Sequence, residues 1–229
     1  MRIILFLLVI SINLYSQPQG KVKLDHYTFN TDKSIQDLKI SAIIWYNGSR
    51  SIQEVPHLNI NTDSTGTSTN SYVKYYLFID SEEHQFFYYG NFSDTSKAIM
   101  HFTKIIPFEK YGGWDLYSNK LFKYNECKKL TDTVINGNRY SRYRLRKFNN
   151  DDINEFILYA ICERKDVPIK YLKSFSEKIG CPIIRMDTYF ADQLAGIAQI
   201  TYISDSLTSY ELKVFEAWEK NFKKYPANK

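Results

Sequence analysis

Two Asn-Gly pairs constrain the fold of this chain more strongly than any other feature of its sequence. Asn47-Gly48 and Asn136-Gly137 each stand between two runs that are rich in β-branched and aromatic residues. Asparagine and glycine both tolerate the positive φ angles of a tight two-residue turn, so each pair predicts a β-hairpin. We therefore expect the chain to be built on an antiparallel sheet.

Aromatic residues predict further strands. The 229 residues include 19 tyrosines and 15 phenylalanines, and such side chains suit a pleated, half-buried surface. Outside the two hairpins, runs of this composition predict strands over residues 72–79, 85–89, 182–189 and 196–204. Residues 61–71 are small and polar, with almost nothing to bury, and predict a solvated loop.

Residues 150–164 fit two different structures. Their apolar residues recur at helical spacing, with Asp151-Asp152 at the start and Arg164-Lys165 at the end, as a helix dipole favours. The same segment follows turn-forming asparagines and contains a continuous apolar run, which fits a buried strand. We favour the strand and keep the helix as the alternative.

The last predicted element is an amphipathic helix over residues 208–224. Thr208 and Glu211 have the spacing of a capping box, in which each side chain bonds the backbone N–H of the other residue. Val214 and Trp218 follow at helical spacing, and lysines precede Pro226. The sequence therefore predicts an α+β fold: a mainly antiparallel, twisted or partly rolled sheet with this helix packed against it.

The N-terminus predicts export. Residues 1–16 combine one positive charge, a short apolar run and a small residue at Ser16, as a cleavable signal peptide does. We expect residues 17–229 to form a single β-rich domain in the periplasm or outside the cell. The first cysteine lies far from the cleavage point, which argues against a lipid anchor, and no later stretch reaches the ~20 apolar residues of a membrane span.

Three cysteines, Cys127, Cys162 and Cys181, would enter an oxidising compartment after export. Their number is odd, so at least one stays unpaired or pairs between chains. We expect a disulfide between Cys162 and Cys181, with Cys127 buried and free. Three buried thiols are the alternative.

Motifs for catalysis, metals and nucleotides are not found in the sequence. It contains no nucleophile elbow, phosphate-binding loop or dinucleotide fingerprint, and its four histidines never stand at metal-ligand spacing. We therefore predict no catalytic residue, no metal ligand and no cofactor. The net charge of +5 is small and interleaved with acidic residues, which argues against a nucleic-acid partner.

One basic run has the right spacing to form a charged stripe. Arg142, Arg144 and Arg146 alternate along a predicted strand and therefore share one face of it. The face is either simply solvated or an anion-binding stripe, and we expect the solvated form.

The order of features resembles the GLPGLI family of small exported proteins of Gram-negative bacteria. The resemblance covers residues 38–204 and rests on Tyr75–Asp80 with Phe86–Tyr88, on Cys127–Lys129, on Asp166–Ile169 and on Gly180-Cys181-Pro182. At the position of the motif that names the family, only Gly180, Pro182 and Ile184 correspond. The resemblance implies an antiparallel β architecture and export, and supplies no catalytic residue.

These features favour a non-enzymatic envelope protein that binds an envelope partner or a small apolar or carbohydrate ligand. The alternative is a secreted hydrolase whose site is assembled from distant residues, such as His84 or His101 beside Asp187 or Asp192. Such a site would need these side chains in one place, whereas a concave, apolar sheet would favour binding.

Overall fold

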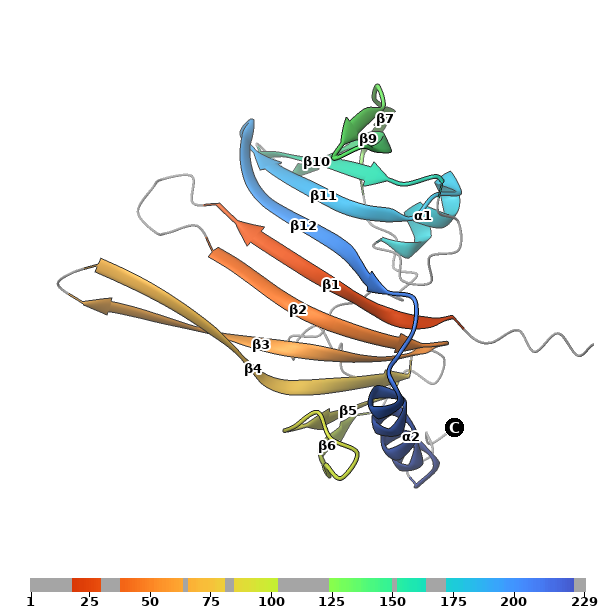
Figure 1. Cartoon of the computed structure of the whole chain (residues 1–229). Helices are drawn as coiled ribbons and strands as arrows, with labels where there is room; N and C mark the ends of the chain where they lie inside the picture. The colour runs from red at the N-terminus through yellow and green to blue at the C-terminus, as the bar shows by residue number, and fades with distance from the viewer. Residues whose placement is uncertain are drawn as a thin grey trace, which may run out of the picture.

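The computed structural model describes residues 18–29, 38–63, 66–80, 85–102, 124–149, 152–163 and 172–224. Within these residues, twelve strands form one antiparallel sheet, and two helices pack on it (Figure 1). The elements are β1 (Gln19–Thr28), β2 (Leu38–Asn47), β3 (Arg50–Asp63), β4 (Gly66–Asp80), β5 (Gln85–Tyr89), β6 (Ala98–Phe102), β7 (Glu126–Lys129), β8 (Thr133–Ile135), β9 (Asn138–Asn149), β10 (Asp152–Ala160), α1 (Lys173–Ile179), β11 (Ile183–Phe190), β12 (Gln193–Ser204) and α2 (Ser209–Lys224).

The strand order is β6-β5-β4-β3-β2-β1-β12-β11-β10-β9-β7, and β8 pairs with β9 beside this path. The first strand therefore lies in the middle of the sheet, between β2 and β12. All pairs are antiparallel. The predicted α+β class, with its antiparallel sheet and C-terminal helix, is confirmed.

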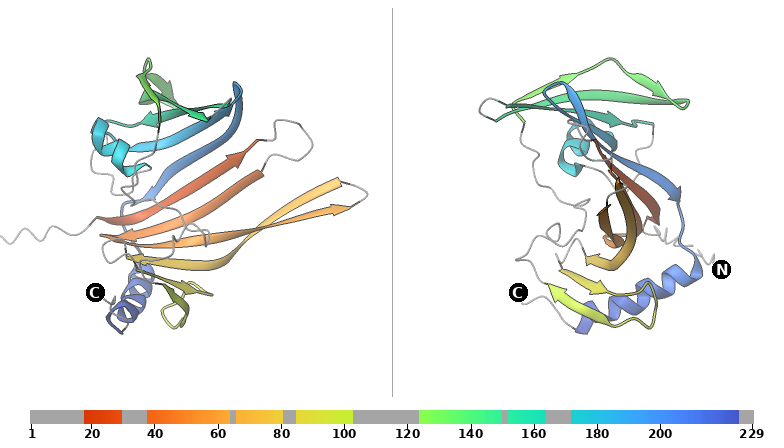
Figure 2. Two further views of the ribbon diagram at one scale, coloured as in Figure 1. Left: turned by 180° about the vertical axis from the view of Figure 1, so that it is seen from behind. Right: turned by 90° about the vertical axis from the view of Figure 1, so that its left-hand side faces the viewer.

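The sheet curls, and its two faces differ. Viewed along the strands in Figure 2, α1 lies inside the curl and α2 lies outside it. Successive residues of a strand point to opposite faces, so Ile44 packs with the inner cluster while its neighbour Trp45 packs with α2. We call these the inner face and the outer face.

Both Asn-Gly pairs form hairpins, but the two turns differ. Asn136 and Gly137 have φ angles of 50° and 79° between the paired residues Ile135 and Asn138, as expected of a type I′ turn. At the first hairpin Asn47 pairs with Arg50, so the turn residues are Gly48 and Ser49. Gly48 has a φ of 61° and stands first, which is the pattern of a type II′ turn one residue later than expected.

The expected loop over residues 61–71 is wrong. β3 and β4 pair as far as Asp63 and Gly66, with one register shift between Val55 and Pro56, and these polar residues form a long two-stranded arm that projects from the sheet (Figure 1). Backbone pairing continues from the apolar part of the hairpin into the arm. The hydrogen bonds between the two strands do not require apolar side chains. In residues 150–164, the strand is confirmed, because residues 152–160 form β10.

The capping box at the start of α2 is confirmed. The backbone N–H of Thr208 donates to Glu211 Oε2 at 2.7 Å, and the backbone N–H of Glu211 donates to Thr208 Oγ1 at 3.3 Å. Glu211 Oε1 also accepts hydrogen bonds from Lys21 Nζ and Trp45 Nε1, both at 2.8 Å. Burial alone would raise the pKa of Glu211, but these bonds outweigh it and lower the pKa to about 2.

The apolar side of α2 forms the largest buried cluster with the outer face of β2 to β5. Trp218 is fully buried, stacks on Tyr89 with 3.7 Å between ring centroids, and donates its indole N–H to the carbonyl of Ser93 at 2.9 Å. The other buried members are Trp45, Ile52, Phe78, Phe87, Leu207, Val214 and Phe215. The predicted packing of the Trp218 side on the sheet is thus confirmed.

The turn between β11 and β12 offers a stability test. Ala191 and Asp192 connect the paired residues Phe190 and Gln193 with φ angles of 46° and 64°. An L-residue in this left-handed region costs roughly 1–2 kcal/mol. We expect Ala191→Asn combined with Asp192→Gly to raise the free energy of unfolding by about 1 kcal/mol, measured by urea titration.

The matched control reverses the exchange in the other type I′ turn. Asn136→Ala combined with Gly137→Asp should lower the free energy of unfolding by a similar amount. Equal stability of both double variants and the parent would contradict the assignment of strain to Ala191 and Asp192.

Candidate functional site

The inner face of the sheet is apolar over its central strands. Pairing places Val22 of β1 opposite Ile44 of β2, and Leu24 of β1 opposite Ile200 of β12. Val22 and Ile44 are fully buried. The complete buried cluster at this position consists of Val22, Leu24, Ile44, Tyr46, Ile161, Ile184 and Ile200.

A second apolar cluster continues the inner face toward β5. Ile44 lies opposite Gln53, Gln53 opposite Leu77, and Leu77 opposite Tyr88, so the two clusters share one face. The buried members of the second cluster are Val55, Leu77, Ile79, Phe86 and Tyr88. Of the residues that the structure describes, none from α1 or α2 belongs to either cluster.

Two polar residues interrupt this apolar surface. Ser51 and Gln53 of β3 are fully buried on the inner face, and Gln53 Nε2 donates to Ser51 Oγ at 3.5 Å. A buried polar side chain costs free energy unless it is hydrogen-bonded. The pair is therefore one buried polar position within apolar surroundings.

The far part of the inner face is covered by α1. Phe175 of α1 packs on Leu145, Leu158 and Ile183, which come from β9, β10 and β11. The helix ends at Gly180, whose φ of 68° is the usual left-handed helix end.

The three cysteines all lie at this end of the sheet. Cys162 and Cys181 form a disulfide, which joins the end of β10 to the start of β11 and closes the segment that contains α1. The expected burial of Cys127 is wrong, because its free thiol is exposed. Cys127 lies on the four-residue edge strand β7, opposite Leu145 and at the border of the sheet, where no described residue covers it.

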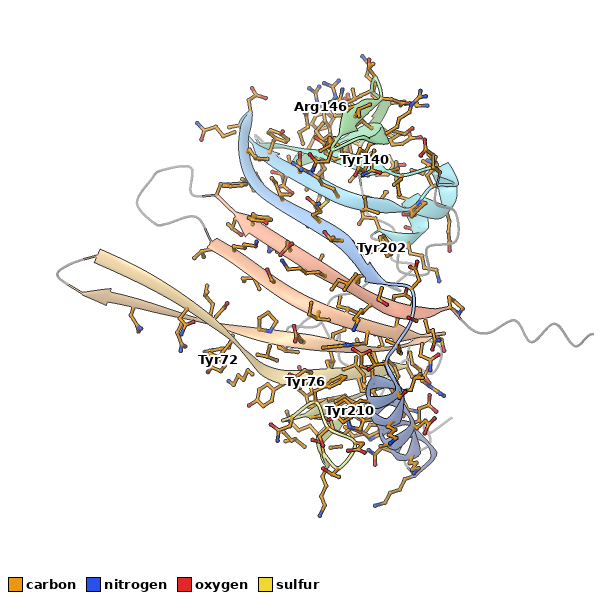
Figure 3. All side chains as sticks on the ribbon, in the orientation of Figure 1. Tyr72, Tyr76, Tyr140, Arg146, Tyr202 and Tyr210 are labelled. Atoms are coloured by element: carbon orange, nitrogen blue, oxygen red, sulfur yellow. A yellow bond between two sulfur atoms is a disulfide. The ribbon has the colours of Figure 1, made fainter. Side chains whose placement is uncertain are left out.

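The three arginines of β9 share one face, as expected, but each has a partner there. Arg142 Nε donates to the carbonyl of Thr131 at 2.8 Å. Arg146 Nε lies 2.8 Å and Arg144 Nε 3.8 Å from Glu155 Oε2. Figure 3 shows Arg146 at the edge of the sheet. An added anion would have to compete with Glu155 for two of the three guanidinium groups.

Asp187 lies on the outer face within a compact polar group. Its carboxylate accepts bonds from Arg185 Nε at 2.7 Å, from Arg185 Nη2 at 3.1 Å and from the Tyr159 hydroxyl at 2.9 Å. Burial, together with the Asp187 charge, raises the pKa of Tyr159 to about 12. The ring of Tyr159 also lies under the Arg185 guanidinium, so this group holds β10 and β11 together.

The histidine and carboxylate pairs expected of a hydrolase are not brought together where they can be described. His101 is on β6, where it stacks on Phe87 with 4.2 Å between ring centroids and where burial lowers its pKa. Asp187 is on β11, and six strands separate the two in the sheet. Asp192 lies in the turn after β11, and His84 lies outside the described residues.

Within the described ranges, no group of three or more His, Cys, Asp or Glu residues is arranged to hold a metal ion. No helix in the described part of the chain is long and apolar enough to cross a membrane. The predicted signal peptide, residues 1–16, lies outside those ranges.

Sequence reasoning missed the buried Ser51–Gln53 pair. The alternation of Ser51, Gln53 and Val55 with Ile52 and Glu54 is the available signal, since it gives each set one face of a strand. Alternation does not say which face is turned inward, and a polar residue is normally placed outside. Only the pairing of β3 between β2 and β4 places these two side chains on the inner face.

Comparison with known proteins gives distant structural similarities only. No family model and no curated protein sequence matches the chain. LprF from Mycobacterium bovis is 9% identical over 84% of this chain and 88% of that chain, with a TM-score of 0.42. A LolA superfamily protein from Nitrosomonas europaea is 8% identical over 82% and 86%, with a TM-score of 0.29. The resemblance to the GLPGLI family stays a prediction.

Proposed function

We propose that this chain is an exported, non-enzymatic envelope protein that holds a small apolar molecule against the inner face of its curled sheet. One observation carries the proposal: the inner side chains of the central strands form two adjoining apolar clusters without help from either helix. Export rests on the predicted signal peptide.

The apolar character of this face is what a ligand would recognise. Small-molecule sites are mostly apolar and carry a few polar groups that orient the ligand. On this face Leu24, Ile44 and Leu77 are the apolar residues, and Ser51 with Gln53 is the polar group. All five are fully buried, so a ligand would reach them by displacing the atoms that cover them. This composition suits a hydrocarbon chain that carries one polar substituent.

The proposal is tested by a matched pair of tryptophan substitutions. Ile200 of β12 points to the inner face, whereas its neighbour Thr201 is exposed on the outer face. We expect Ile200→Trp to fill the site and to weaken binding of N-phenyl-1-naphthylamine at least tenfold, measured by fluorescence titration with hexadecanoic acid as competitor. Thr201→Trp adds the same bulk outside and should leave the dissociation constant unchanged.

Overpacking costs typically ~1–3 kcal/mol, so the folded state of each variant is first verified by circular dichroism. Absence of probe binding to the parent protein, or equal loss in both variants, would contradict an inner-face site.

A further inference from the structure

β2 and β3 separate after a short ladder and leave a fork between them. They pair at four positions only, from Asn47–Arg50 to Ile44–Gln53. β2 nevertheless continues through residues 38–43, and β3 continues through residues 54–63. Figures 1 and 2 show the two strands diverging over these residues. We call the space between these two segments the fork.

Both sides of the fork are held extended from behind. β2 pairs with β1 at ten positions along its whole length, and β3 pairs with β4 at fourteen. Neither segment therefore depends on a partner inside the fork for its strand conformation. Within the described part of the chain, no ladder uses the edges that face each other.

The hairpin register identifies the backbone groups that point into the fork. In an antiparallel strand, alternate residues direct both N–H and C=O to the same side. The N–H of Ile43 points toward β3, because it donates to Glu54 Oε2 at 2.7 Å. Lys39 and Ser41 have the same alternation as Ile43, so their N–H and C=O groups also point into the fork.

The two strands are prevented from closing the fork on each other. The Glu54 carboxylate takes the N–H of Ile43 that would continue the ladder. Pro56 follows at the next position of β3 that faces β2, and proline has no N–H to donate. Closure would leave these groups mismatched, so among the described residues no strand pairs with the edge of β2 over residues 39–41.

We propose that the β2 edge of the fork binds an extended peptide segment of another protein as an added strand. A polypeptide in β conformation is the ligand that presents donors and acceptors at the spacing of Lys39 and Ser41. Side-chain pockets on the two faces would then select the sequence, because alternate residues of the added strand point to alternate faces.

The neighbouring side chains indicate an alternating apolar and acidic peptide. Ile40 and Ala42 of β2 lie on the inner face, beside which apolar residues fit. On the outer face, Lys23 and Lys39 share the carboxylate of Asp25, at 3.0 and 3.9 Å. The Lys39 side chain is 50% exposed. Glu54, the other carboxylate of this face, is engaged by the N–H of Ile43, so the half-exposed Lys39 is the cation that an acidic residue of the peptide would meet.

The test uses a capped nine-residue peptide of alternating glutamate and valine. Binding is followed by amide hydrogen exchange of Lys39 and Ser41, measured by nuclear magnetic resonance on the full chain. We expect the peptide to slow exchange at both amides at least tenfold. Three comparison peptides are used. Two are N-methylated at alternate residues, one at the odd-numbered and one at the even-numbered positions. The third has lysine in place of each glutamate.

Protein variants separate backbone pairing from side-chain contact. Ser41→Pro removes the N–H that faces the fork and should reduce peptide affinity at least tenfold, while Ser41→Ala keeps that N–H and should retain binding. Lys39→Glu should reverse the preference in favour of the lysine peptide. Equal protection by the parent peptide and both N-methylated peptides, or no protection by the parent peptide, would overturn the proposal. These outcomes are independent of probe binding at the inner face.

Discussion

Replacing Trp218 with alanine is expected to lower the free energy of unfolding by about 3–5 kcal/mol, the range found for large aromatic residues in protein cores. Trp218 is the largest fully buried side chain of the cluster between α2 and the sheet. Its removal leaves a cavity against Phe78 and takes away the stack on Tyr89. Urea unfolding monitored by circular dichroism measures the effect.

Two further variants divide this effect into its parts. Trp218→Phe keeps an aromatic ring but removes the hydrogen bond to the carbonyl of Ser93, and should cost less than alanine does. Lys213→Ala changes an exposed residue of the same helix and should stay within about 0.5 kcal/mol of the parent. A loss below about 1 kcal/mol for the alanine variant would be inconsistent with α2 as part of the core.

The second large effect is expected at Glu211. Its carboxylate caps α2 and also binds Lys21 of β1 and Trp45 of β2, so a single side chain joins the helix to the middle of the sheet. The shift of its pKa from 4.5 to about 2, at about 1.4 kcal/mol per pKa unit, corresponds to roughly 3 kcal/mol of stability at neutral pH. Glu211→Gln should lose most of this amount.

The pH dependence of this contribution has a definite sign. The folded state keeps Glu211 ionised to about pH 2, whereas the unfolded chain takes up a proton near the ordinary value of 4.5. The contribution is therefore complete above about pH 5 and disappears as the pH falls toward 2. The difference in unfolding free energy between parent and Glu211→Gln should shrink over the same interval.

Glu216 provides the control for this measurement, since it lies on the exposed side of the same helix. Glu216→Gln should change the free energy of unfolding by less than about 0.5 kcal/mol. A difference between parent and Glu211→Gln that stays constant from pH 7 to pH 2 would contradict a role for the ionised carboxylate.

Local chemistry predicted those elements that depend on neighbouring residues in the sequence. The hairpin at Asn136-Gly137 and the capping box of Thr208 with Glu211 each need only a few adjacent residues to form. The turn at Gly48 was placed one residue early because both Asn47-Gly48 and Gly48-Ser49 can form a two-residue turn. The register of the strands decided between them.

Features that depend on the order of the strands in the sheet could not be predicted from local sequence. The polar residues of the arm, such as Thr67 and Asn70, form strands because the β3–β4 pairing continues through them. The exposure of Cys127 follows from the place of β7 at the border of the sheet. Neither the strand conformation of the arm nor the exposure of Cys127 follows from the residues of its own segment. Sequence patterns alone therefore predicted a loop for the arm and a buried thiol for Cys127.

The central position of β1 also bears on how the chain folds as it is synthesised. Thr28 lies opposite Gly196, and Lys21 lies opposite Ser204, so the middle of the sheet joins the two ends of the described chain. Contacts between such distant segments form late and slow folding, because a long loop must close first. During synthesis, β1 would have one edge without its partner until β12 emerges. A chain with this strand order cannot complete the core between β1 and β12 until nearly all of it has been synthesised.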